Sequence, residues 1–411
     1  MNDGVYRMRF KTGTPTAESL KNVAASEFFF YCAYIPWLTL QILNASMFAR
    51  YLQGARGAAV RLVALCLLTL SYLLQKGMRR RDLFALIIAT LLIAPVYVNR
   101  VNIIIDNIMF ILLSAKFNFR KTAKVSLVVL VAGLVSIVLC AKSGIIQNYI
   151  LFNGLRKREY LGFLYALRAP QFYFAIVSLY LYITNGHVGV PTIIAMIAIG
   201  AAIFRATDSR ALFIITLIAV IVCPFLARVD SDFPLIRIMA YPLVHIYALC
   251  AVLSLFACSA YAHSNNLMVF LDSPELLSGR ISLAYESIRI YGIKLFGNYM
   301  EIVGSGLTSY GEEQIGKAYF YIDNMYIHLL VGYGVIFSVV FIVLQTKLCH
   351  NCYINSNWCT LALLSIIALH CLFDDLSLFI QYNPFLLLLS SSLNKKPIDT
   401  DVNEQEIICV V

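Results

Sequence analysis

The stretch AKVSLVVLVAGLVSIVLCA, residues 123–141, decides the fold class. Lys124 is its one charged residue, and a membrane-spanning helix needs about 20 mostly apolar residues. Similar runs recur along almost the whole chain, so we predict an all-α, polytopic transmembrane helical bundle of about 12 spans. The predicted spans are 28–48, 58–75, 83–98, 101–115, 123–141, 162–183, 188–204, 211–227, 238–262, 323–345, 358–373 and 376–392.

The composition excludes an ordinary soluble domain. Of the 411 residues 60% are hydrophobic and 13% are charged, and the mean hydropathy is +0.78. Soluble domains carry about 45–50% apolar and about 25% charged residues. The eleven cysteines are scattered, mostly within apolar runs, which is typical of small core residues. The lone Cys349-x-x-Cys352 pair has no second pair at zinc spacing, so no metal site is predicted.

Charge predicts the orientation of the chain. An even number of spans places both termini on one side, and the three densest Lys/Arg clusters fall on that side, which the positive-inside rule assigns to the cytoplasm. Residues 1–27 lack the apolar region of a cleavable signal peptide. We therefore predict a cytoplasmic segment 1–27, a transmembrane domain 28–262, a large extracytoplasmic loop 263–321, C-terminal transmembrane helices 322–393 and a cytoplasmic tail 394–411.

Arginine is favoured over lysine on the predicted outer side. The outer segments hold ten Arg and four Lys, whereas the cytoplasmic segments hold eight Arg and nine Lys. Lysine satisfies the topology rule equally well, so the excess of arginine fits planar forks that grip phosphate with two hydrogen bonds. Alternatively, outer arginines such as Arg50, Arg56, Arg61 and Arg100 extend their side chains to lipid headgroups.

The sequence of the large loop predicts a helix followed by turns. From Leu276 to Phe296 apolar residues recur at helical spacing, and Arg280 and Tyr291 fall on this helix. Glycines at 297, 304, 306 and 311 then break the chain into turns. Such a loop suits a substrate platform on the outer face of the membrane. An amphipathic surface helix without chemistry is the alternative.

Ionisable residues within predicted spans are functional candidates by default. Asp323 opens the span after the large loop, and His328 lies about one helical turn beyond it. A carboxylate at a helix start is also a normal capping choice, which gives Asp323 an alternative explanation. No phosphate-binding or dinucleotide-binding motif occurs in a suitable context. The other candidates are Asp106 and Arg168, within predicted spans, and Asp374 and Asp375, between the last two spans.

Four local runs resemble a known family. They are RKREYLGF (156–163), TDSRALF (207–213), LLSGRISLAYESIRIYGIKLFG (276–297) and YIDNMYIHLLVGYGVIF (321–337). In this order, around one large late loop, they resemble the Wzy-type bacterial polysaccharide polymerases of the O-antigen ligase and polymerase superfamily. The family often has Pro-Asn where this chain has Pro170-Gln171, and related ligases carry His in place of Asp323.

The resemblance implies a GT-C-like membrane fold and a glycosyltransferase activity. The growing glycan would pass from undecaprenyl diphosphate to the acceptor sugar of a new lipid-linked repeat unit, on the outer face of the bacterial cytoplasmic membrane. The implied polymer is an O-antigen, capsule or exopolysaccharide. No cofactor and no nucleic-acid partner are expected. A chain-length regulator and a flippase of the same pathway are the implied protein partners, and the bilayer is the surrounding medium.

The resemblance and the chemistry together select the site residues. A diphosphate is already a good leaving group, so the protein must mainly orient two substrates and neutralise developing charge. We expect Arg210 and Arg280 to be catalytic, with Asp323 as general base. The expected substrate-binding residues are Arg156, Arg158, Arg168, Arg205, Arg289 and Tyr291.

Three other functions remain open from the sequence. A ligase of the same superfamily would move finished glycan onto another acceptor. A flippase or other secondary transporter of lipid-linked oligosaccharide would move its substrate without chemistry, but transporters often show paired halves, which this sequence lacks. A membrane scaffold without activity is the third alternative.

Overall fold

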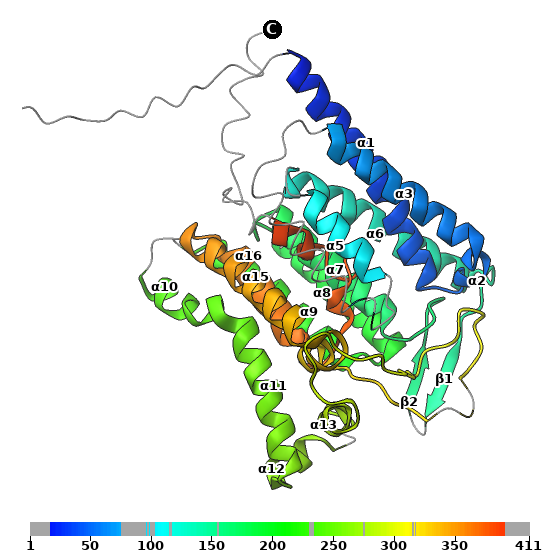
Figure 1. The fold of residues 1–411 in the computed structure, drawn as a ribbon, viewed down its shortest axis with the longest axis vertical. Coiled ribbons are helices and arrows are strands. Elements are labelled where there is room, and N and C mark those ends of the chain that lie inside the picture. Colours follow the sequence, from blue (N-terminus) through cyan, green and yellow to red (C-terminus); the bar gives the residue numbers. More distant parts are fainter. Residues whose placement is uncertain are drawn as a thin grey trace, which may run out of the picture.

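A computed structural model describes residues 17–74, 96, 98, 103–114, 117–153, 156–229, 234–273, 276–314, 316 and 318–390. The chain is mostly helical over this part (Figure 1). The N-terminal helices are α1 (Ala17–Asn44), α2 (Ala49–Leu52), α3 (Ala55–Leu74), α5 (Ile103–Leu113) and α6 (Phe119–Lys142). The central helices are α7 (Arg168–Ile183), α8 (Val190–Thr207), α9 (Arg210–Leu226), α10 (Pro234–Ala240), η2 (Pro242–His245) and α11 (Ile246–Ala262).

The remaining elements follow a short hairpin and the large loop. The hairpin strands are β1 (Ile150–Asn153) and β2 (Arg156–Glu159). The large loop carries α12 (Asn266–Leu271) and α13 (Arg280–Tyr291). The C-terminal elements are α14 (Met325–His328), the π-helical turn η3 (Leu329–Tyr333), α15 (Gly334–Ile354), α16 (Trp358–His370), η4 (Leu376–Leu378) and η5 (Pro384–Leu388).

The described helices include six that are long and apolar enough to cross a membrane. They cover Asn22–Asn44, Ala55–Leu74, Phe119–Lys142, Val190–Thr207, Pro234–Ala262 and Met325–Ile354. Large apolar side chains such as Val128 and Leu139 on α6 and Ile194 on α8 face outward. Soluble proteins rarely expose large contiguous apolar surfaces, whereas lipid accepts them. The protein is therefore a mostly helical membrane protein.

Helices α7 and α16 form the centre of the bundle. Nearly all their residues are buried, and α9 packs against both of them. Phe174 of α7 lies 5.7 Å from the His370 ring of α16, between ring centroids. A helix surrounded by protein on all sides is held rigidly, so the residues at its ends have fixed positions.

Most predicted spans coincide with helices, with shifted ends. Helix α1 begins at Ala17, within the predicted cytoplasmic segment, and α7 begins at Arg168, six residues after the predicted start at 162. The chain before Arg168 forms turns, and Leu161 adopts a left-handed conformation with φ 52°. The predicted span 83–98 lies almost entirely outside the described residues.

The predicted spanning helix 376–392 is wrong over its described part. Residues 371–390 instead contain two short 3₁₀ turns joined by irregular backbone, and most of their side chains are buried. Pro384 disfavours a helical conformation at Asn383. Side chains supply partners for this backbone, since the Asn383 amide donates to the carbonyl of Ser377 at 3.0 Å. Irregular backbone of this kind is tolerated in a membrane protein where other parts of the protein surround it.

The all-α prediction also missed a β-hairpin. Strands β1 and β2 pair antiparallel, with Ile150 opposite Glu159 and Leu151 opposite Arg158. β-branched and aromatic residues such as Ile150 and Phe152 favour strands, but the polar run 156–159 carries no such signal. The hairpin, α12 and α13 lie at one end of the molecule, opposite the N-terminal end of α1 (Figure 1).

The loop helix is shorter than predicted. It begins at Arg280 after Gly279 and ends at Tyr291 before Gly292. The Asp272 carboxylate accepts hydrogen bonds from the backbone N–H groups of Ile281 at 2.7 Å and Ser282 at 3.1 Å. These N–H groups have no partner within the helix, and a carboxylate there also interacts favourably with the helix dipole. Asp272 therefore fixes where α13 starts.

The chain after α13 is fastened to the π-helical turn. Gly297 has φ +78°, and a Cβ at this position would overlap the carbonyl oxygen of Gly332. The neighbouring Asn298 N–H donates to that carbonyl at 3.1 Å, and the Asn298 amide donates to the Val331 carbonyl at 2.9 Å. A residue without a side chain is needed at 297 for this close approach.

We expect Gly297→Ala to destabilise the protein. Gly316, in the same loop, has φ +81° with open space around it, so Gly316→Ala is a matched control with the same backbone strain. Steric overlap should lower the unfolding free energy of Gly297→Ala by about 1–3 kcal/mol more than that of Gly316→Ala. Thermal unfolding of the two purified variants in detergent measures the difference. Equal melting temperatures would contradict the close approach.

Candidate functional site

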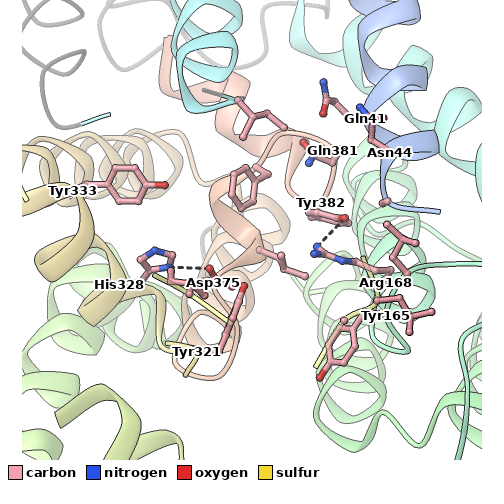
Figure 2. Close-up of a pocket in the computed structure, with 18 residues that line it drawn as sticks. Gln41, Asn44, Tyr165, Arg168, Tyr321, His328, Tyr333, Asp375, Gln381 and Tyr382 are labelled. Carbon is pink, nitrogen blue, oxygen red and sulfur yellow. Dashed lines mark hydrogen bonds and ion pairs between the residues drawn. The ribbon is translucent and has the colours of Figure 1, made fainter. Parts of the chain in front are cut away.

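Two adjoining cavities lie between the large loop, the chain around the start of α7 and the segment after α16. The first has a volume of about 390 Å³ and the second about 210 Å³. Tyr165, Arg168, Tyr321 and Asp375 line both of them. These residues come from the start of α7, the end of the large loop and the segment after α16 (Figure 2). Segments far apart in the sequence thus converge on one hollow.

A histidine–aspartate pair forms one wall. The His328 Nδ1 lies 2.8 Å from an oxygen of Asp375, and the exposed fractions of the two residues are 5% and 3%. Tyr321 donates its hydroxyl hydrogen to the other Asp375 oxygen at 2.7 Å. In the neutral imidazole with Nδ1 donating to Asp375, the second nitrogen, Nε2, carries the lone pair. Nε2 is buried and has no hydrogen-bond partner in the described structure.

The π-helical turn positions this histidine. His328 ends α14, and η3 follows it directly. The Tyr333 ring lies 5.7 Å from the His328 ring, between centroids, and both residues line the larger cavity. The Tyr333 hydroxyl is also buried without a partner in the described part of the chain. Single π turns are frequent at functional sites because they displace side chains from the regular helix.

Arg168 forms the opposite wall of the larger cavity. Its Nη1 donates to the Tyr382 hydroxyl at 2.9 Å, and its guanidinium carbon lies 5.1 Å from the centroid of the Tyr382 ring. A guanidinium above an aromatic face is held in place without losing its charge. Figure 2 shows Arg168 and His328 on different sides of the same hollow.

Arg280 and Asp323 form an ion pair beside the smaller cavity. The Arg280 Nε lies 3.1 Å from an oxygen of Asp323, and their side chains are 25% and 23% exposed. Asp323 lines the smaller cavity. Burial raises the pKa of Asp323 from 3.8 to about 6, and Arg280 counteracts part of this effect. The pair links α13 of the large loop to the start of α14.

Asp323 should therefore make stability depend on pH. Because its pKa in the folded protein exceeds the ordinary value of 3.8, protonation favours the folded state. The contribution of Asp323 to the free energy of unfolding is fully present below about pH 4, and it is lost as the pH rises through about 6. We expect the melting temperature of the wild type, relative to Asp323→Asn, to fall over this interval. A constant difference between pH 4 and pH 7 would contradict the raised pKa.

Asp374 shapes the turn beside the smaller cavity, which it also lines. Its Oδ1 accepts a hydrogen bond from the Leu376 N–H at 2.7 Å, which holds the turn that presents Asp375. This turn places Asp375 against His328.

The structure brings only some of the sequence-predicted residues to the cavities. Arg168, Asp323 and, through its ion pair with Asp323, Arg280 lie at them. Arg289 instead pairs with Glu286 on the exposed side of α13 at 2.8 Å. Tyr291 packs against Phe320 with 6.0 Å between ring centroids. Arg156 belongs to β2, and its side chain lies outside the described part.

Three other predicted arginines lie in β2 and around the junction of α8 and α9. Arg158 donates to the Asp208 carbonyl at 3.4 Å, and the Arg210 Nε lies 3.5 Å from the Asp208 carboxylate. Arg205 is exposed in the last turn of α8, and the Arg210 side chain is 62% exposed. We call Arg158, Arg205 and Arg210 the arginine patch. None of the three lines either cavity.

The His328–Asp375 pair was not predicted as the site. In the sequence, Asp375 is a charge between two apolar runs and His328 is a neighbour of Asp323. Nothing in the local sequence links two residues that are 47 positions apart. Within the described residues, no group of three or more His, Cys, Asp or Glu side chains is arranged to hold a metal ion.

Comparisons with protein-family models, with curated proteins and with solved structures found no match to this chain.

Proposed function

We propose that the protein is a glycosyltransferase of the polysaccharide-polymerase type. It transfers the growing glycan from undecaprenyl diphosphate to a hydroxyl of a new lipid-linked repeat unit. The observation that carries the proposal is the placement of His328 and Arg168 on different walls of one cavity. Glycosyl transfer to a hydroxyl needs two groups. One is a base with a free nitrogen to accept the proton, and the other is a fixed cation to stabilise the leaving group.

In this mechanism His328 is the general base. The acceptor hydroxyl gives its proton to Nε2 while its oxygen forms a bond with the anomeric carbon of the donor sugar. Asp375 orients the ring and stabilises the imidazolium that results. His328 takes this role in preference to Asp323, because Nε2 has no partner among the described residues whereas Asp323 accepts a hydrogen bond from Arg280.

Arg168 stabilises the leaving group. The bond between the anomeric carbon and the diphosphate oxygen breaks, and its electron pair leaves with the diphosphate. The guanidinium offers several N–H donors in one plane, which suits two phosphate oxygens at once. One donor is held by Tyr382, so the fork has a fixed direction before the substrate arrives. Arg280 adds positive charge at the smaller cavity through its position on α13.

The arginine patch attracts the anionic substrates toward the cavities. Arg205 and Arg210 are exposed and Arg158 is half-buried, and the three residues lie at the ends of α8 and α9 and in β2. Exposed cations attract anionic lipid-linked substrates over about a Debye length but contribute little to the chemical step. In this proposal both termini lie in the cytoplasm, so the cavities open on the outer face of the membrane. The fold is a GT-C-like bundle of about 12 membrane crossings. The segment after α16 is one of these crossings and has an irregular backbone.

Incubation of the purified protein with a lipid-linked repeat unit tests the proposal. A ladder of products on a gel, each longer by one repeat unit, is the expected result. A single transfer to a different acceptor would assign the protein to the ligases instead. Transbilayer movement of the lipid without any new glycosidic bond would overturn the proposal in favour of a flippase.

A further inference from the structure

A third cavity adjoins the larger one on the side of α1. Its volume is about 280 Å³, close to the lower size of ligand pockets, roughly 300 Å³. It lies among α1, α2, α3 and α5. Gln41, Asn44 and Ile103 line both this cavity and the larger one, so the two adjoin at these residues. The proposed mechanism makes no use of this space.

Three side-chain amides gather where the cavities meet. Gln41 and Asn44 come from the last turn of α1, and Gln381 comes from the segment after α16 (Figure 2). Gln41 is 8% exposed and Gln381 is 5% exposed. The Gln381 side-chain oxygen is buried without a hydrogen-bond partner in the described structure. A buried amide without a partner costs stability, which is often offset by binding a ligand or water.

The far wall of the third cavity carries an ion pair whose two charges neutralise each other. Arg61 donates to both oxygens of Asp106, from Nε at 2.6 Å and from Nη2 at 2.8 Å. Asp106 is fully buried, and the Trp37 indole N–H donates to it at 3.1 Å. The guanidinium charge is thus balanced within the protein. Among the described residues of this wall, an anionic headgroup would find no cation other than the neutralised Arg61.

The lining chemistry selects the class of ligand. An amide offers both a donor and an acceptor, as a sugar hydroxyl does. Hydrocarbon would leave the amides unpaired, and an anion would find the Arg61 charge already neutralised. We propose that Gln41, Asn44 and Gln381 form a saccharide subsite for the donor glycan, next to the sugar that reacts. Gln381 directly precedes Tyr382, which holds Arg168, so this subsite adjoins the place proposed for the diphosphate.

The saccharide subsite rests on the proposed function, but its test measures glycoside binding and does not require turnover. The probes are the methyl glycosides of glucose, galactose, rhamnose and N-acetylglucosamine, titrated by saturation-transfer NMR against the full-length protein in nanodiscs. At least one glycoside should bind the wild type. Gln381→Leu and Asn44→Ala should each raise its dissociation constant by about three- to tenfold, the effect of one lost neutral hydrogen bond.

Two controls separate the possible failures. Gln345→Leu replaces a buried glutamine of α15 that lines none of these three cavities, and it should leave glycoside binding unchanged. His328→Ala should also retain binding while polymer formation is lost. Absence of binding to the wild type, or binding that Gln381→Leu and Asn44→Ala do not alter, overturns the subsite. Glycoside binding without any polymer from the wild type would overturn only the proposed function.

Discussion

Replacing His328 by alanine should lower the rate of polymer formation by about 10²- to 10⁴-fold, the usual contribution of a general base. Nε2 is the buried ring nitrogen without a partner in the described structure, and the substitution removes this base. Steady-state rates with a lipid-linked repeat unit measure the effect. The comparison requires equal amounts of folded protein in the membrane.

Asp375 provides a sharper form of the same prediction. Because its role is to orient His328, Asp375→Asn should slow transfer, but Asp375→Asn combined with His328→Ala should be no slower than His328→Ala alone. His263→Ala, which changes an exposed histidine at the end of α11, is the matched control. A rate for His328→Ala close to that of the wild type, with normal melting behaviour, would remove His328 from the mechanism.

Replacing Arg168 by alanine should lower kcat by about 10²- to 10³-fold, as does loss of one preorganised donor to a developing anion. Arg168→Lys keeps the charge but loses the planar fork and its contact with Tyr382, so its rate should lie between those of the alanine variant and the wild type. Wild-type kcat in Arg168→Lys would show that bidentate geometry at this position is not used.

Arg210→Lys is the matched control for Arg168→Lys. The Arg210 side chain is 62% exposed and is solvated in the arginine patch. Exposed ion pairs contribute about 0.2–1 kcal/mol, so its KM should rise by less than about fivefold with little change in kcat. A larger fall in kcat for Arg210→Lys than for Arg168→Lys would return the catalytic role to Arg210, where the sequence motif had placed it.

The sequence predicted the regular helices well because lipid imposes a local rule. An exposed spanning helix must be apolar along its length, and α6 at 119–142 and α8 at 190–207 lie within a few residues of the predicted spans. The rule fails where protein replaces lipid. Residues 376–390 are apolar enough for a span, yet they fold irregularly because neighbouring side chains supply hydrogen-bond partners.

The site could be predicted only in part, for a related reason. Arg168 and Asp323 are ionisable groups in or beside apolar runs, and this signal is visible in the sequence. The partner of His328 is decided by tertiary packing, since the segment after α16 has to fold back against α14 to place Asp375 there. The exposed arginines carried stronger motif signals than the buried pair, although they lie outside the cavities.

The central claim is that His328 and Arg168, which line the larger cavity, catalyse cleavage of the bond between a sugar and a lipid diphosphate. Its most direct measurement is the release of undecaprenyl diphosphate by purified protein supplied with a lipid-linked repeat unit. We predict one molecule released for each glycosidic bond formed by the wild type, and release near background in His328→Ala and Arg168→Ala. Glycosidic bonds formed at the wild-type rate by both variants would contradict the account, as would substrate movement across the bilayer without release.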